Sequence, residues 1–216
     1  MSLSLGKVDV VEEPKPGDLL NETVTNVLGG RMQPNLTNNT RKVCGKTLVL
    51  GGSRSGKSAF AESLFQNCEN NKIYIATAQA MDTEMASRID KHRQQRDELW
   101  QTIEEPLDII TTIKKCNITG NAFLVDCLTI WLSNLIHAGR DVERESHKLS
   151  QYLTNNNVDI VMVSNEVGLG IIPENALARQ FSDYAGKLNQ LMAQTAENVF
   201  FISAGLPISL KTPYKK

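Results

Sequence analysis

The residues numbered 51–58 follow a pattern that suits them to bind phosphate. They read Gly-Gly-Ser-Arg-Ser-Gly-Lys-Ser, which matches GxxxxGK[ST], and they stand between a short apolar run and a helical run at 59–65. Glycines allow backbone N–H groups to converge on phosphate oxygens at the start of a helix, where side chains would intrude. The pattern therefore predicts a P-loop, and a glycine-rich turn that arose by chance is the weaker alternative.

The residue types within this loop predict separate roles. Lys57 supplies a positive charge to the β- and γ-phosphates of a nucleotide, and the hydroxyl of Ser58 is a ligand for Mg²⁺. The other predicted nucleotide-binding residues of the loop are Gly51, Gly52, Ser53, Arg54, Ser55 and Gly56. We expect a nucleoside triphosphate, ATP or GTP, to bind here together with Mg²⁺.

A second candidate for metal chemistry is the carboxylate of Asp126. It ends the apolar run Phe-Leu-Val-Asp, which begins at Phe123, and an acid at the end of a buried strand is placed to orient a metal or its water. Taken alone, Asp126 is better explained as a cap for the helix predicted to begin near Leu128. Beside a P-loop, the metal role is favoured.

One histidine, His92, lies in a basic segment whose spacing predicts a helix at 82–100. A neutral imidazole can attack an α-phosphate while neighbouring cations stabilise the charge that develops on the phosphate oxygens. Without further context, a solvated basic helix with an incidental histidine is the better explanation. The surrounding cations are Arg88, Lys91, Arg93 and Arg96.

The elements that must position these residues alternate along the chain. Short runs rich in β-branched residues, at 47–50, 73–76, 123–125, 160–163 and 199–202, are separated by helical patterns. This alternation predicts an α/β fold of the P-loop NTPase type, a parallel sheet with helices on both faces.

The longest helical pattern runs from Leu177 to Thr195, and its 4,3 spacing predicts one apolar stripe that faces the core. Pro173 and Glu174 suit the first turn of this helix. The segment at 165–170, Asn-Glu-Val-Gly-Leu-Gly, follows a predicted strand, where open parallel sheets bind ligands. The residues do not decide between a ligand-binding loop and an ordinary glycine-rich turn.

Composition narrows the classes of function. The 216 residues are 41% hydrophobic and 22% charged, as in ordinary globular proteins, and the formal net charge of -1 offers no field to attract nucleic acid. There is no apolar run of the length that spans a membrane, and four cysteines without a CxxC pair suggest free thiols. We expect a cytoplasmic protein that binds small anions, with no nucleic-acid partner and no membrane span.

The N-terminal part differs from the rest of the chain. Residues 1–45 are polar, interrupted by proline and glycine, and asparagine-rich at 35–39, which predicts a flexible extension. Residues 46–216 are predicted to form one P-loop domain.

Seven ordered segments between Lys46 and Lys211 resemble one family. They are GGSRSGKSAFAE from Gly51, YIATA from Tyr74, DTEMASRIDKHRQQR from Asp82, WQTIEEPLD from Trp100, LVDCLTIWLSNLI from Leu124, VSNEVGLGIIPENALARQFSDYAGKLNQ from Val163 and AGLPISLK from Ala204. The chain resembles the bifunctional adenosylcobinamide kinase / adenosylcobinamide-phosphate guanylyltransferases of cobalamin biosynthesis.

The resemblance implies two reactions. One moves a phosphate from ATP or GTP to a hydroxyl of adenosylcobinamide, and the other transfers GMP from GTP to adenosylcobinamide phosphate through a GMP adduct of His92. It also implies a possible homo-oligomer, a metal near Ser58 and Asp126, and further nucleotide contacts. Those contacts fall on Ile75, Ala76, Thr77, Arg93, Gln94, Gln95, Arg96, Glu104 and Asp126.

Two alternatives stay open. A P-loop kinase of another small metabolite would leave His92 with a structural role only. A nucleotide-regulated binding protein without catalysis is weaker, because the chain has no NKxD guanine motif. The preference between ATP and GTP in the kinase reaction is also open.

Overall fold

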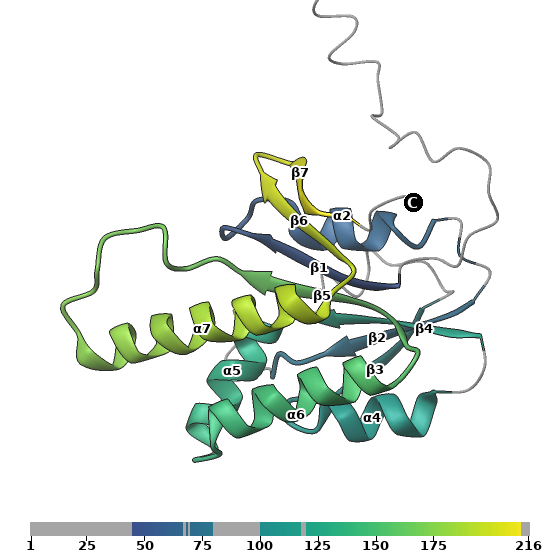
Figure 1. The fold of residues 1–216 in the computed structure, drawn as a ribbon, viewed down its shortest axis with the longest axis horizontal. Coiled ribbons are helices and arrows are strands. Elements are labelled where there is room, and N and C mark those ends of the chain that lie inside the picture. The colour runs from purple at the N-terminus through teal and green to yellow at the C-terminus, as the bar shows by residue number, and fades with distance from the viewer. Residues whose placement is uncertain (1–44, 67, 69, 80–99, 118–119, 213–216) are drawn as a thin grey trace, which may run out of the picture. The chain divides into compact units, whose positions relative to one another are not determined.

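Seven strands in the described part of the chain form one sheet. The structure is a computed structural model, and it describes residues 45–66, 68, 70–79, 100–117 and 120–212. The strand order is β3-β2-β4-β5-β1-β6-β7, and all neighbours are parallel except β6 and β7 (Figure 1). The strands are β1 (Lys46–Gly51), β2 (Asn71–Ala76), β3 (Trp100–Glu104), β4 (Asn121–Asp126), β5 (Asp159–Asn165), β6 (Asn198–Ser203) and β7 (Leu206–Lys211).

Helices cover both faces of this sheet, as predicted. Strand residues alternate between the faces, so Val49 packs with the helix α2 while its neighbours Leu48 and Leu50 pack with the helices of the opposite face. Figure 1 shows α2 on one side and the other labelled helices on the other. The helices are α2 (Lys57–Ser63), α4 (Ile109–Cys116), α5 (Leu128–His137), α6 (Val142–Asn155) and α7 (Ala176–Thr195).

The five predicted strands are confirmed, because each lies within β1, β2, β4, β5 or β6. Their apolar runs are continuous because these inner strands are covered on both faces: the run from Ile160 to Val163 is at most 1% exposed. In a parallel sheet the carboxyl ends of all strands lie at the same edge. The P-loop and Asp126 both lie at that edge, after β1 and at the end of β4.

Two strands were not predicted. The predicted helix at 82–100 ends too late, because Trp100 is the first residue of β3 and pairs with Lys72 of β2. Strand β7 forms an antiparallel hairpin with β6, and all six of its residues are exposed. Pro207 fits this outer position, since an edge strand can lack one backbone donor without breaking a ladder.

The start of α7 also differs from the prediction. Pro173 and Glu174 precede the helix, because Asn175 is the N-cap and its Oδ1 accepts hydrogen bonds from the backbone N–H groups of Leu177 and Ala178 at 2.8 and 3.1 Å. The apolar stripe is core only along its later part: Leu188 is 2% exposed, whereas Leu177 is 62% exposed. The first turns of α7 extend past the sheet in Figure 1, so they have no core to pack against.

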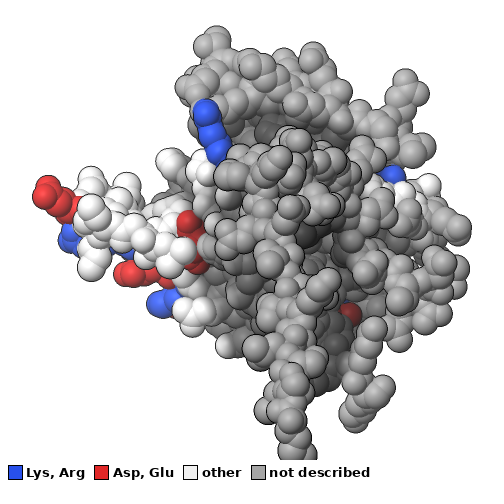
Figure 2. Space-filling model, turned by 90° about the horizontal axis from the view of Figure 1, so that it is seen from above, with Lys and Arg blue, Asp and Glu red and all other residues white. Residues whose placement is uncertain are grey.

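The connection between β5 and α7 is unusually apolar for an exposed segment. Leu169, Ile171 and Ile172 are 81%, 97% and 79% exposed. In Figure 2 this segment forms the projection at the left, which is mainly uncharged with acidic and basic groups beside it. None of the helices in the described ranges combines the length and apolarity needed to cross a bilayer.

Candidate active site

The turn between β1 and α2 requires glycine at two of its positions. Gly51 has φ 154°, and a Cβ there would stand 2.5 Å from the backbone oxygen of Ile202 in β6. Gly56 is the N-cap of α2 with φ 97°, a left-handed conformation that side chains disfavour, and a Cβ would lie 3.2 Å from the Cα of Gly205. Close backbone approach and left-handed backbone conformation therefore account for glycine at these two positions.

Lys57 turns its ammonium group into the loop. The residue is 7% exposed, and its Nζ donates a hydrogen bond to the backbone oxygen of Gly52 at 2.6 Å. Burial lowers the pKa of Lys57, while the nearby Cys127 and Asp126 act in the opposite direction. The side chain is thus already held inside the arch of the loop, where an incoming phosphate can replace the carbonyl as its partner.

Ser58 and Asp126 are in direct contact, although 68 residues separate them in the sequence. The Oγ of Ser58 donates a hydrogen bond to Oδ2 of Asp126 at 2.8 Å, and the hydroxyl of Tyr74 donates to the same oxygen at 2.9 Å. Asp126 does not cap α5, because the N-cap residue is Cys127 and no side chain accepts a capping bond there. The carboxylate is therefore held by the P-loop serine and a tyrosine of β2.

Tyr74 is itself fixed by an aromatic cluster. Its ring meets that of Trp100 edge to face, with centroids 6.1 Å apart, and Trp100 meets Phe65 beyond α2 at 4.9 Å. Tyr74 is 4% exposed. This packing limits the rotation of the tyrosine and so fixes the direction from which its hydroxyl reaches Asp126.

Thr77 secures the backbone that follows Asp126. Its Oγ1 donates to the backbone oxygen of Cys127 and accepts from the backbone N–H of the same residue, both at 2.8 Å, next to a cis peptide bond between Asp126 and Cys127. Thr77 and Ile75 are fully buried and Ala76 is 8% exposed, so these three predicted nucleotide-binding residues have their side chains inside the fold. Burial raises the pKa of the Cys127 thiol to about 12, so this thiol stays protonated and is no nucleophile.

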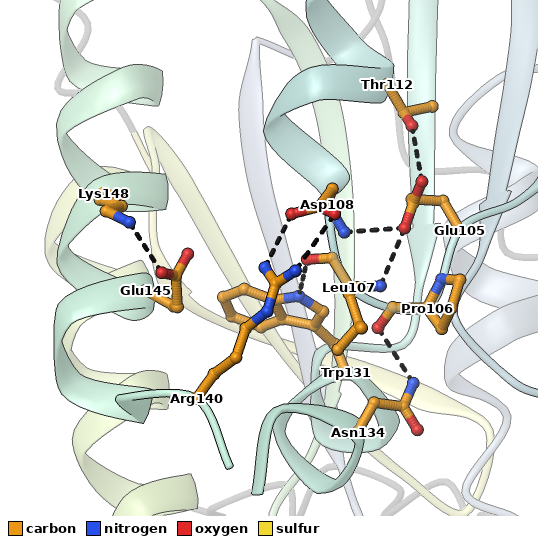
Figure 3. A network of polar contacts seen from close by, with 10 residues as sticks. All are labelled: Glu105, Pro106, Leu107, Asp108, Thr112, Trp131, Asn134, Arg140, Glu145 and Lys148. Carbon is orange, nitrogen blue, oxygen red and sulfur yellow. Dashed lines mark hydrogen bonds and ion pairs between the residues drawn. The ribbon is translucent and has the colours of Figure 1, made fainter. Parts of the chain in front are cut away.

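Glu104 ends β3 at the same edge and is exposed. The turn that follows is held by the network in Figure 3. Oε1 of Glu105 accepts from the backbone N–H groups of Leu107 and Asp108, and its Oε2 accepts from Thr112. Glu105 thereby satisfies backbone donors at the start of α4, which fixes the place where Glu104 leaves the sheet.

Helix α5 contributes three further bonds, donated by two of its side chains. Nδ2 of Asn134 donates to the backbone oxygen of Pro106 at 3.0 Å (Figure 3) and to that of Thr77 at 2.8 Å, and so joins the end of β2 to the turn after β3. Trp131 donates from its indole to the backbone oxygen of Leu107 at 2.8 Å. These bonds fix the ends of β2 and β3 relative to α5.

The P-loop is also held from outside. The backbone N–H of Gly205, in the turn between β6 and β7, donates to the oxygen of Ser55 at 2.8 Å, and the N–H of Glu166 donates to the oxygen of Gly51 at 3.0 Å. Ser53 and Arg54 are exposed. The Oγ of Ser55 is buried and has no hydrogen-bond partner within the described ranges, so a polar group remains for a ligand inside the cradle.

The structure does not describe several of the predicted site residues. His92 and the four residues after it, Arg93, Gln94, Gln95 and Arg96, lie outside the described residues. Their proposed contacts therefore remain predictions. The residues that sequence reasoning missed are Tyr74 and the Gly205 turn, and the only signal for them was their presence in the segments beginning at Tyr74 and Ala204.

Comparisons with known proteins give a consistent result. A family model described as CobU, cobinamide kinase / cobinamide phosphate guanyltransferase, matches residues 47–210. The bifunctional adenosylcobalamin biosynthesis protein CobP of Pseudomonas aeruginosa is 44% identical over 168 residues, which cover 77% of this chain and 97% of that protein. The bifunctional adenosylcobalamin biosynthesis protein CobU of Escherichia coli is 35% identical over 179 residues, with 76% and 98% covered.

One solved structure is similar in fold alone. The solved structure of a protein from Pyrococcus horikoshii OT3 matches this chain with a TM-score of 0.50 and 10% identity, and the match covers 81% of this chain and 90% of that one. At this identity the likeness supports the α/β architecture and carries nothing about substrates.

Proposed function

The chain belongs to the cobinamide kinase / cobinamide phosphate guanyltransferase family, and on this premise we propose that it catalyses both reactions on adenosylcobinamide. It is an enzyme with ATP or GTP as phosphate donor in the first reaction and GTP as the GMP donor in the second. The observation that carries the proposal is the contact between Ser58 and Asp126 beside the buried Lys57. We assign this chemistry to the domain formed by residues 46–216, which includes the whole segment that the family model matches.

In the kinase reaction the P-loop backbone binds the triphosphate, and Lys57 exchanges its bond to Gly52 for the β- and γ-phosphates. The hydroxyl oxygen of adenosylcobinamide then forms a bond to the γ-phosphorus, while the bond from that phosphorus to the bridging oxygen breaks and the nucleoside diphosphate leaves. The hydroxyl proton is released. Most of the rate enhancement comes from positioning and from charge stabilisation, as in other phosphoryl transfers.

The residues around Ser58 fit a magnesium ion. Its hydroxyl proton points to Asp126, which leaves the oxygen lone pairs of Ser58 for a cation, and the carboxylate of Asp126 is a suitable acceptor for metal-bound water. When bound, Mg²⁺ would neutralise charge on the β- and γ-phosphates. Ser58 and Asp126 would hold it, and Tyr74 would keep the carboxylate oriented.

In the second reaction we assign the nucleophile to His92, by family resemblance. A ring nitrogen would form a bond to the α-phosphorus of GTP as the bond to the pyrophosphate oxygen breaks, and Arg93 and Arg96 would stabilise the developing charge. The phosphate of adenosylcobinamide phosphate then attacks the same phosphorus and displaces the histidine. The strand before this segment, β2, ends at the edge that carries the P-loop.

The test is covalent labelling with [α-³²P]GTP and Mg²⁺. The wild-type chain should acquire acid-labile, base-stable label that adenosylcobinamide phosphate discharges, and His92→Ala should acquire none while it keeps kinase activity. His147→Ala is the matched control, because His147 is an exposed histidine on α6 and should label as the wild type does. Folded wild-type protein without any label would remove the histidine route and leave a P-loop kinase.

The variant Lys57→Ala tests whether both reactions use the P-loop to bind the triphosphate. Both reactions should be lost, because the same cradle binds the triphosphate in each. Full guanylyl transfer by folded Lys57→Ala would show that the second reaction uses another nucleotide site.

A further inference from the structure

A buried polar cluster lies where β5 ends, and the proposed reactions use none of it. Thr129 of α5, Ser164 of β5 and Asn189 of α7 are 7%, 2% and 6% exposed. Ser164 donates to Oδ1 of Asn189 at 2.7 Å, and its Oγ lies 3.2 Å from that of Thr129. Burial of three polar side chains is costly unless each is hydrogen-bonded, so such a cluster persists where it fixes something.

What the cluster fixes is the backbone of one residue, Asn165. The backbone N–H of Asn165 donates to Oγ1 of Thr129 at 2.6 Å, and its backbone oxygen accepts from Nδ2 of Asn189 at 3.1 Å. Side chains from two helices therefore hold both polar groups of the last residue of β5. In the strand register Asn165 lies opposite Gly51, the first residue of the P-loop.

The side chain of Asn165 faces the P-loop side of the sheet. Alternate residues of a strand share a face, and Val161 and Val163 belong to the apolar cluster that contains Ala61 of α2. Asn165 continues this series, whereas Ser164 points to α5 and α7. The side-chain amide of Asn165 is half-buried and has no hydrogen-bond partner within the described ranges.

The position between two strand ends defines what this amide can reach. Strand β5 lies between β1, which leads into the P-loop, and β4, which ends in Asp126. In the proposed site Lys57 would take the β- and γ-phosphates, and Ser58 and Asp126 would hold a metal beside them. A group between Gly51 and Asp126 therefore stands at the outer end of the triphosphate. An amide offers two N–H donors without adding charge.

We propose that the side-chain amide of Asn165 donates a hydrogen bond to the terminal phosphate of the bound triphosphate and so distinguishes triphosphate from diphosphate. Thr129 and Asn189 are positioning residues that act through the backbone of Asn165. The inference rests on the proposed nucleotide site and adds to it a residue that responds to transfer of the γ-phosphate.

The experiment compares two ligands in the presence of Mg²⁺, the non-hydrolysable β,γ-imido analogue of ATP and ADP, by calorimetric titration of the full chain. Asn165→Ala should weaken binding of the imido analogue about tenfold or more, the loss expected for one hydrogen bond to a charged group, and should change ADP binding less than about twofold. Asn157→Ala is the matched control, because Asn157 is exposed just before the opposite end of β5.

A pair of variants at Thr129 tests the positioning role without a change at Asn165. Thr129→Val keeps the shape of the side chain but removes the hydroxyl, and it should weaken binding of the imido analogue more than binding of ADP. Thr129→Ser retains the hydroxyl and should restore wild-type discrimination. Folding of each variant is checked by its thermal unfolding midpoint with and without ADP.

The outcomes separate this inference from the nucleotide site itself. Equal weakening of both ligands in Asn165→Ala, or no weakening of either, would overturn the role of Asn165 while wild-type binding remained intact. A wild-type chain that binds neither ligand, or that binds both as well after Lys57→Ala, would overturn the nucleotide site on which the inference rests.

Discussion

Asn134 allows a quantitative test of the framework that holds the active-site strands. Its Nδ2 donates to two backbone oxygens, that of Pro106 after β3 (Figure 3) and that of Thr77 after β2. Asn134→Ala removes both bonds and leaves unsatisfied the carbonyl of the fully buried Thr77 and that of the half-buried Pro106.

The expected loss follows from these contacts. Each intramolecular hydrogen bond contributes about 1 kcal/mol net, and a carbonyl left unsatisfied in a partly buried place adds to the cost. Alanine is the better helix former by about 0.5 kcal/mol, which offsets part of the loss within α5. We expect the free energy of unfolding to fall by about 2 kcal/mol, which corresponds to roughly 4–8 °C in Tm for a domain of this size.

The assay is urea unfolding at equilibrium, followed by circular dichroism, with Asn156→Ala as control. The control residue also donates from its amide to a backbone oxygen, that of Tyr152, but it is exposed and its loss should cost less than about 0.5 kcal/mol. If Asn134→Ala unfolds within 0.5 kcal/mol of the wild type with an unchanged m-value, the two bonds do not stabilise the strand ends as argued.

Three further predictions concern the site and its surroundings. Tyr74→Phe keeps the aromatic packing but removes a donor to Asp126, so the Mg²⁺ concentration for half-maximal kinase activity should rise severalfold; an unchanged Mg²⁺ dependence would refute this positioning role. Gly51→Ala places a Cβ 2.5 Å from a backbone oxygen of β6, so its unfolding free energy should drop by about 1–3 kcal/mol and nucleotide affinity should fall, whereas wild-type affinity would contradict the close approach. The hydrogen bond from Arg140 holds the pKa of Asp108 below its usual value, so the pair stabilises the fold above about pH 4 and loses this effect as pH falls through the lowered pKa. Because the pair is largely exposed, Arg140→Gln should cost at most about 1 kcal/mol at pH 7 and progressively less as the pH falls through the lowered pKa of Asp108, and a cost that does not change with pH would count against the pair.

The inner strands could be predicted because their sequence carries the signal of burial on two faces. The residues of β4 and β5 are apolar in succession, since neither face meets water. The outer strands carry no such signal: β3 has no fully buried residue and β7 has only exposed ones. The pairing of β7 with β6 and of β3 with β2 stabilises them, and that pairing is not written in their own composition.

The motif residues could be predicted because they are contiguous, whereas their partners could not. Tyr74 reaches Asp126 because β2 pairs with β4, with Ala76 opposite Asp126, so the two side chains meet at one edge. Strand β2 pairs with β3 on one side and with β4 on the other, and the pairing with β4 depends on the packing of the whole domain. A sequence read locally shows a tyrosine in a strand and gives no reason to connect it with a carboxylate 52 residues later.

The strand order explains why the residues around Asp126 come from several elements. Because β5 lies between β1 and β4, the P-loop and Asp126 are not on adjacent strands, and α2 must cross β5 to bring Ser58 within 2.8 Å of the carboxylate. The end of β5 then lies between the ends of β1 and β4, and in the nucleotide site proposed above Asn165 would face the triphosphate. The buried cluster of Thr129, Ser164 and Asn189 follows from this arrangement, since the residue at that strand end must be held without the help of a continuing ladder.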